Sequence, residues 1–241
     1  MMFIRKWMIG LTGALLIAAP GNALAFDDLE QTNGREEIQY LKTHDIIAGI
    51  TGTEFQPDAP LTNAQGVAFL VKGLDLNIDN LRFIKAPKAS DYFIGMDDSA
   101  WYSTDMMIAQ LNGLELAQSI DTSATMSRVQ FASLLWQGVE QLDPDIHESG
   151  GATGALQDEA ITIKDDDSLN DSQRDVLSQV IDSDIASVDA EGNFRPDVPI
   201  TRAEAAVMLY NALELTGKIQ PNADNQADDT HSDDAKVDDS K

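Results

Sequence analysis

Two distant segments of this chain share one pattern of residues. Residues 55–64 read FQPDAPLTNA and residues 194–203 read FRPDVPITRA, so both follow F-x-P-D-x-P-[LI]-T-x-A. A shorter third copy ends with MSRVQ at residues 126–130. The register of the first two copies also pairs apolar residues outside the pattern: Leu41 with Val180, Ile46 with Ile185, Leu70 with Leu209, and Leu74 with Leu213. Repeated units of this size cannot bury their apolar faces alone, so we expect three units that share one core.

The repeats divide the chain into three units joined by polar loops. We place these units at residues 26–78, 91–142 and 161–215. Within each unit, apolar residues recur at helical spacing before and after a loop rich in turn residues. The loop of the middle unit is shorter and lacks the Phe-x-Pro segment of the other two. The pattern predicts an all-α fold made of three helix-loop-helix repeats.

The two ends of the chain differ in composition from the units. Residues 1–25 contain Arg5 and Lys6, then an apolar run and the sequence Ala-Leu-Ala, which together are typical of a signal peptide and its cleavage site. The run is shorter than the roughly 20 apolar residues that span a bilayer, so we expect secretion without a membrane anchor. Residues 216–241 are rich in aspartate and almost free of apolar residues. This composition predicts an acidic disordered tail.

The charge of the chain excludes one class of partner. The sequence holds 41 acidic and 16 basic residues, for a formal net charge of −25 at pH 7. Binding to nucleic acid depends on cationic contacts that release counterions, so nucleic acid is not an expected partner. The sequence also contains no cysteine, which rules out redox chemistry through thiols.

The sequence lacks the motifs that usually carry catalysis. It has neither a nucleophile elbow nor a phosphate-binding glycine loop. Its three histidines are far apart and lack the spacing of zinc ligands. Residues 165–171, DDDSLND, lack the glycine that an EF-hand calcium loop requires, and we interpret them as a solvated helix start. We therefore predict a non-catalytic protein with no cofactor and no metal site.

Each expected second helix begins with a hydroxyl residue followed three positions later by Gln or Glu. The pairs are Thr62 with Gln65, Ser127 with Gln130, and Thr201 with Glu204. In such a capping box the hydroxyl accepts a hydrogen bond from the third helical amide, and the longer side chain accepts one from the amide of the cap residue. A cap stabilises its helix by about 1 kcal/mol, so we interpret these residues first as structural.

Two of these helices carry an arginine at their first position, Arg128 and Arg202. The helix dipole is positive at this end, so a cation there is disfavoured by roughly 0.3–1 kcal/mol. One explanation is an ion pair with a neighbouring acid such as Asp197 or Glu204. The other is an anionic ligand, bound by the guanidinium and the free amides of the helix start. Under the ligand explanation, replacement by alanine should leave stability unchanged or slightly higher; under the ion-pair explanation, it should lower stability.

The repeated residues resemble S-layer homology domains, whose signature is a G-x-F-x-P loop followed by I-T-R-A-E. The third unit matches this signature at residues 194–196 and 200–204, and the first unit matches it at residues 49–57 and 61–64. The middle unit matches it more weakly. The resemblance implies three tandem repeats in a pseudo-threefold bundle, with one helix of each unit in the centre.

The resemblance also implies a function. In that family, grooves between adjacent units bind a secondary cell-wall polymer that commonly ends in a pyruvylated sugar, and the arginine of I-T-R-A-E contacts its acidic group. By this similarity, Arg202 and Arg128 would contact the glycan, whereas Asn63 stands where the first unit would carry its arginine. We therefore expect a protein of the bacterial cell surface that binds acidic wall polysaccharide and associates with other surface-layer proteins.

A second interpretation also fits these residues. The chain would then be a degenerate copy of such a module that no longer binds wall glycan. It would act in the envelope as an acidic protein that binds cations or other proteins.

Overall fold

The computed structural model describes residues 25–146 and 163–220. These residues form six α-helices and one short 3-10 helix, η1, and they contain no β-strand, so the all-α prediction is confirmed. The helices are α1 (Arg35–Thr43), α2 (Asn63–Gly73), η1 (Ala89–Asp91), α3 (Ser103–Leu111), α4 (Arg128–Leu142), α5 (Asp171–Asp182) and α6 (Arg202–Leu215). No helix of this described part is long and apolar enough to cross a membrane. The expected signal peptide, apart from its last residue, and residues 221–241 of the expected tail lie outside it.

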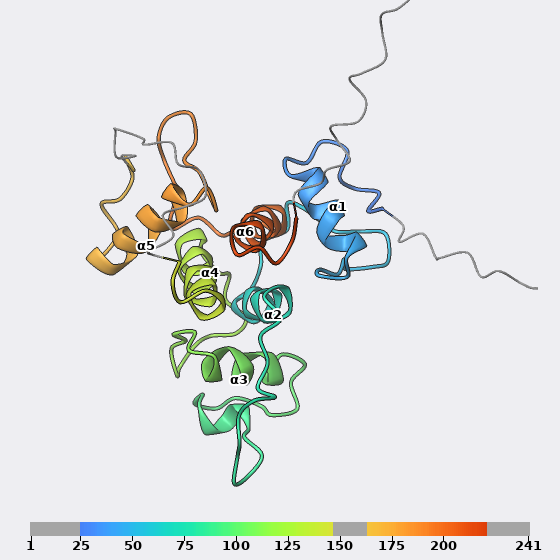
Figure 1. The fold of residues 1–241 in the computed structure, drawn as a ribbon, viewed down its shortest axis with the longest axis vertical. Helices are drawn as coiled ribbons and strands as arrows, with labels where there is room; N and C mark the ends of the chain where they lie inside the picture. Colours follow the sequence, from blue (N-terminus) through green and yellow to red (C-terminus); the bar gives the residue numbers. More distant parts are fainter. Residues whose placement is uncertain (1–24, 147–162, 221–241) are drawn as a thin grey trace, which may run out of the picture.

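The second helices of the three units form the centre of the molecule. α2, α4 and α6 pack against one another, and α1, α3 and α5 lie around them (Figure 1). A central helix is apolar on most of its circumference, as expected for a helix surrounded by protein. In α2, 8 of 11 residues are buried, whereas α1 buries only Ile38 and Leu41.

Each outer helix packs on the central helix of the preceding unit. α3 packs on α2, α5 packs on α4, and α1 packs on α6, which closes the circle. Within the described residues, the two helices of one unit do not pack against each other. The helix-loop-helix unit is therefore a repeat along the chain but not a compact body in space, and every unit depends on its neighbours for burial.

Three backbone hydrogen bonds close a ring just before the central helices begin. Leu61 N donates to Ile200 O at 3.1 Å, Ile200 N donates to Met126 O at 2.9 Å, and Met126 N donates to Leu61 O at 2.9 Å. All three side chains are buried. This ring joins the three units in the same way at each interface, and the pseudo-threefold symmetry itself stays a prediction.

The three predicted capping boxes are all present. Thr62, Ser127 and Thr201 each accept a hydrogen bond from the backbone of the predicted partner, whose side chain accepts one in return. A fourth box, Asn170 with Gln173, begins the outer helix α5 and was not anticipated. These caps fix where the helices start, and thereby where the first helical side chains of α4 and α6 point.

Candidate functional site

Arg202 reaches from the start of α6 into the loop of the first unit. Its Nε donates to the carbonyl oxygen of Phe55 at 2.7 Å, and its Nη2 donates to that of Ala48 at 3.0 Å. The guanidinium carbon lies 4.6 Å from the centre of the Phe55 ring, within the range of a cation–π contact. Burial lowers the pKa of Arg202, and the negative charge of Asp28 opposes this effect. The arginine that the helix dipole disfavours is thus held by the loop of another unit.

Arg128 makes the corresponding contacts one unit earlier. Its Nε donates to the carbonyl oxygen of Phe194 at 2.9 Å, and its guanidinium carbon lies 4.7 Å from the Phe194 ring centre. Its Nη1 also pairs with Glu204 Oε1 at 2.9 Å, and Arg195 Nη2 shares the same oxygen at 3.0 Å. Burial lowers the pKa of Arg128, and Glu204 opposes this shift. One of the two acids considered from the sequence, Glu204, is therefore an ion-pair partner of Arg128.

These contacts favour the explanation in which removal of either arginine lowers stability. Only 6% of Arg128 and 7% of Arg202 is exposed. Removing either guanidinium would leave carbonyl oxygens without their charged donor, which costs more than the relief of an unfavourable helix dipole. The dipole argument considers only the helix to which the arginine belongs, whereas the contacts of each arginine come from the loop of a neighbouring unit.

A carboxylate holds each of the two Phe-x-Pro loops in place. Asp28 accepts hydrogen bonds from the amides of residues 55 and 56, at 2.9 and 2.7 Å. Asp165 does the same for the amides of residues 194 and 195, at 2.8 and 2.7 Å. Burial opposes ionisation of Asp28, but these hydrogen bonds and the charge of Arg202 outweigh it and lower its pKa. Asp165 belongs to the run that superficially resembled a calcium loop, and it serves here as a loop clamp.

The third interface between units is built differently. Asn63, at the start of α2, donates from Nδ2 to the carbonyl oxygen of Asp121 at 2.8 Å, and its amide donates to Ala124 O at 2.8 Å. The loop it meets is the shorter loop of the middle unit, which has no Phe-x-Pro segment. Asn63, which replaces the arginine, and the shortened loop therefore belong to one interface. The shorter side chain meets the shorter loop, and the two are joined by hydrogen bonds.

We expect Asn63→Arg to destabilise the protein. The new guanidinium would be buried against a loop that offers neither the phenylalanine carbonyl nor the ring, and an uncompensated buried charge costs about 3 kcal/mol or more. Urea denaturation measures the loss. Asn63→Ala is the matched control and should cost about 1 kcal/mol, the value of one hydrogen bond. An Asn63→Arg chain as stable as the native one would contradict this account of the interface.

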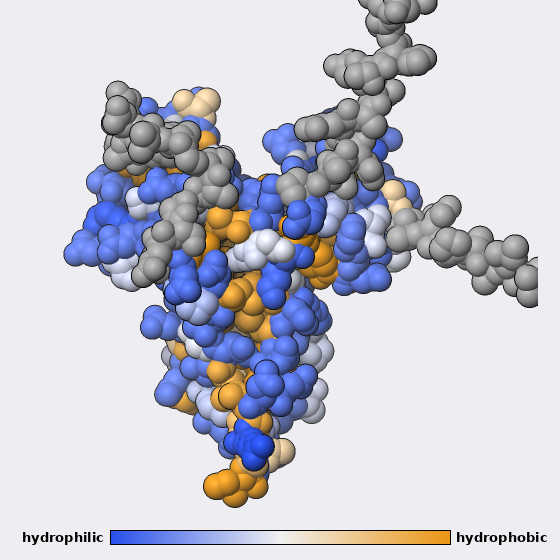
Figure 2. Space-filling view, viewed as in Figure 1, coloured by the Kyte–Doolittle hydropathy of each residue, from blue (hydrophilic) through white to orange (hydrophobic). Residues whose placement is uncertain are grey.

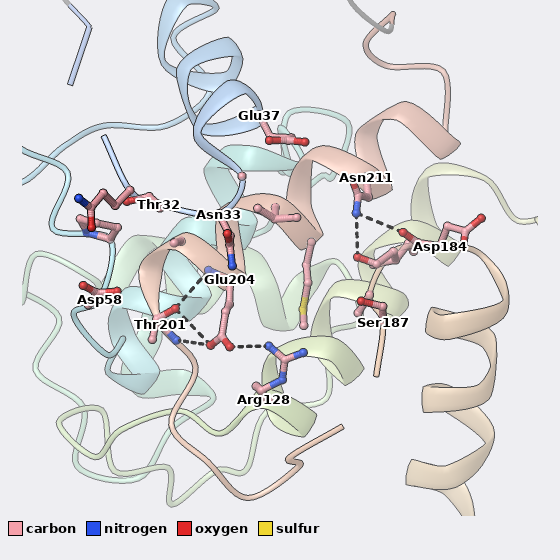
Figure 3. Close-up of a pocket in the computed structure, with 18 of the residues that line it drawn as sticks. Thr32, Asn33, Glu37, Asp58, Arg128, Asp184, Ser187, Thr201, Glu204 and Asn211 are labelled. Carbon is pink, nitrogen blue, oxygen red and sulfur yellow. Dashed lines mark hydrogen bonds and ion pairs between the residues drawn. The ribbon is translucent and has the colours of Figure 1, made fainter. Parts of the chain in front are cut away.

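A cleft of about 630 Å³ opens between the first and third units. Figure 3 shows Thr32 and Asn33 of the first unit facing Ser187 of the third unit across this cleft. At one end, Glu204 is fixed by Arg128 and by Thr201, whose amide and hydroxyl both donate to its Oε2. The cleft thus has a rigid, polar end built by residues from two central helices.

The charged side chains that line this cleft are mostly acidic. It contains one cation, Arg128, and five carboxylates, from Asp28, Glu37, Asp58, Asp184 and Glu204. Such a surface offers many hydrogen-bond acceptors, which suits a ligand rich in hydroxyl groups. Arg202 does not line the cleft, so the structure brings only one of the two predicted arginines to it. Within residues 25–146 and 163–220, no cluster of three or more His, Asp or Glu side chains is arranged to hold a metal ion.

A second cleft, of about 360 Å³, lies at the equivalent position between α4 and α5. Asn63 lines this cleft in the place that Arg128 has in the first. Gln130 and Gln137 of α4 correspond by repeat register to Glu204 and Asn211 of α6. Apart from Arg128, the sequence did not predict the lining residues of the two clefts as site residues, because most of them lie on outer segments that the repeat motif does not include. The repeat register could have indicated these lining residues, because it aligns equivalent positions of α4 and α6.

Comparison with known proteins supports the resemblance at two positions. Residues 25–65 and 166–206 match the S-layer homology domain model. The chain is 25% identical over 196 residues to an amylopullulanase of Thermoanaerobacterium thermosulfurigenes, which covers 80% of this chain and 10% of that protein. It is 24% identical over 216 residues to exoglucanase XynX of Acetivibrio thermocellus, covering 87% of this chain and 18% of that protein.

A third relative, an endoglucanase of Bacillus sp. strain KSM-635, is 23% identical over 212 residues, covering 87% of this chain and 21% of that protein. The chain therefore spans about a fifth or less of the length of these three relatives. The two matched segments contain the Phe-x-Pro loops that Arg202 and Arg128 contact, whereas the presence of three tandem repeats stays a prediction. The chain thus matches the S-layer homology domain model within its first and third units.

Proposed function

We propose that this protein attaches to the bacterial cell surface by binding wall polysaccharide in the cleft between its first and third units. One observation carries the proposal: the two segments that match the S-layer homology domain belong to the two units that form this cleft. The cleft is lined by residues of both units, and their carboxylates and side-chain amides suit sugar hydroxyls.

Arg128 is the group in this cleft that can recognise an acidic substituent, such as a pyruvyl group on a terminal sugar. A guanidinium binds a carboxylate through two parallel hydrogen bonds. In the protein alone, Glu204 occupies Nη1 of Arg128 at 2.9 Å. An acidic sugar must therefore compete with Glu204 for the guanidinium of Arg128. A wall polymer with few acidic groups does not need this guanidinium and avoids the competition.

Arg202 affects the same cleft indirectly, through a loop that lines it. It holds the loop of the first unit, and the next residues of that loop, Pro57 and Asp58, line the cleft. This geometry supports a positioning role for Arg202. Its direct contact with the glycan stays a prediction of the family resemblance.

We propose a non-catalytic role for the chain. It aligns with only a small part of each of the three enzymes, and its sequence holds neither a nucleophile elbow nor a phosphate-binding glycine loop. Export through a signal peptide at residues 1–25 and association with other surface-layer proteins belong to this proposal.

Filling the cleft should weaken wall binding strongly without unfolding the protein. Asn33 and Ser187 are exposed residues on opposite walls, so Asn33→Trp and Ser187→Trp should each weaken cosedimentation with purified cell walls by about tenfold or more, equivalent to ~1.4 kcal/mol. Ser168→Trp is the matched control, because Ser168 is exposed and lies outside the cleft. Thermal melting should be the same in all three variants. Wall binding that survives both cleft variants would refute the proposed site.

A second candidate function rests on the five carboxylates of the cleft. They favour an acidic envelope protein that binds cations or basic partners over one that binds an acidic polymer. The same preparation separates the two. Failure of the native chain to sediment with walls, together with a higher melting temperature in millimolar calcium or magnesium, would support this second function.

A further inference from the structure

Exposed hydrophobic side chains gather in one part of the described chain. Five of the seven large hydrophobic residues that the structure leaves exposed lie between residues 81 and 101. Three of them stand within four positions of one loop: Leu81 is 45% exposed, Phe83 39% and Ile84 fully exposed. Contiguous exposed apolar side chains usually mark a contact surface.

The same loop concentrates positive charge in an acidic protein. Residues 81–88 read LRFIKAPK and contain three cations, Arg82, Lys85 and Lys88, with no acidic residue. Within residues 25–146 and 163–220, the ion pairs of Lys85 and Lys88 are long and largely exposed, at 3.8 Å to Asp91 and 3.7 Å to Asp98. Exposed pairs of this kind are weak and exchange readily for other anions. Arg82 makes no ion pair with any residue of the described part.

The loop projects from one end of the molecule. It precedes η1 and lies beyond α3, on the far side from the central helices (Figure 1). Figure 2 shows hydrophobic and strongly hydrophilic side chains side by side at this tip. The surface is convex, so it suits an extended surface such as a membrane better than a small ligand that binds in a pocket.

We propose that the loop of residues 81–88 binds the surface of a membrane that contains anionic lipids. Phe83 and Ile84 would enter the boundary between headgroups and acyl chains, and the three cations would contact the anionic headgroups. A soluble polyanion would attract the cations but would leave both apolar side chains in water. The remaining acidic surface would be repelled by the same lipids, so only this tip would touch the membrane. This contact is separate from the cleft and does not depend on the proposed wall binding.

Vesicle cosedimentation of the full chain tests the proposal. The protein should bind vesicles of phosphatidylcholine with phosphatidylglycerol, and it should bind pure phosphatidylcholine vesicles at least about tenfold more weakly. Phe83→Asp combined with Ile84→Asp should abolish binding. Replacing Arg82, Lys85 and Lys88 by glutamine should remove the preference for anionic vesicles. Ile50→Asp is the matched control, because Ile50 is 50% exposed in the first unit, and this variant should bind as the native chain does.

Several outcomes would overturn the proposal. The native chain could fail to bind anionic vesicles, or the Phe83→Asp, Ile84→Asp variant could bind them unchanged. Self-association that this variant abolishes, seen by sedimentation velocity without lipid, would assign the tip to a second copy of the chain. Binding of soluble polyphosphate that is unaffected by the variant would assign the cations to a polymer. Wall sedimentation should be the same in the variant and the native chain, so failure of the wall proposal would be seen separately.

Discussion

A chain that ends at Leu142 is expected to lose cooperative unfolding altogether. Truncation there removes α5 and α6, and with them the surface on which α1 packs and the helix that contacts both α2 and α4. It also opens the backbone ring, because Leu61 N and Met126 O both bond to Ile200. Heat and urea unfolding, followed by circular dichroism, should show a broad and shallow change instead of a transition.

The matched control is a chain that ends at residue 220. It lacks only residues 221–241, whose composition predicts disorder, and it should melt as the full chain does. A sharp transition in the chain ending at Leu142, with the enthalpy per residue of the full chain, would mean that the units fold independently. That result would contradict the packing of each outer helix on a neighbouring unit.

Arg202→Ala is expected to lower the free energy of unfolding by about 3 kcal/mol. The substitution removes two hydrogen bonds from a charged donor, at 2.7 and 3.0 Å, and the contact with the Phe55 ring. The carbonyl oxygens of Phe55 and Ala48 would lose that donor in a largely buried site. For a protein of this size the loss corresponds to a fall in melting temperature of roughly 6–12 °C, which calorimetry can measure.

Two further variants make the result specific to these contacts. Arg174→Ala removes an arginine that is 39% exposed in its side chain and pairs with Asp166 and Asp171, so it should cost less than about 1 kcal/mol. Arg202→Lys keeps the charge but loses the planar fork, and it should fall between alanine and the native residue. An Arg202→Ala chain that melts at or above the native temperature would contradict this structural role and favour the ligand explanation.

Local features of this fold could be predicted from the sequence, because their partners are close along the chain. Thr201 and Glu204 are three positions apart, and that spacing alone predicts their reciprocal hydrogen bonds. Asn170 and Gln173 show the same spacing and could have been recognised in the same way. The contacts of Arg202 could not, because its acceptor on Phe55 is a backbone atom 147 positions away.

Sequence patterns also could not predict which helices pack against each other. Apolar spacing indicates that α1 has a buried face, but it does not say whether α2 or α6 covers that face. For the same reason Asn63 and the short loop of the middle unit were interpreted as two separate departures from the family pattern. The structure shows Asn63 bonded to Asp121 in that loop, so one interface accounts for both.

The ring of hydrogen bonds among Leu61, Met126 and Ile200 also affects the order in which parts of the chain can pack during synthesis. A chain is made from its N-terminus, and α1 lies on α6, the last helix of the described part. Contacts between residues so far apart form late, because the chain must close a long loop first. The buried face of α1 therefore stays uncovered until the third unit has been synthesised, whereas α2 can pack on α3 and α4 before then.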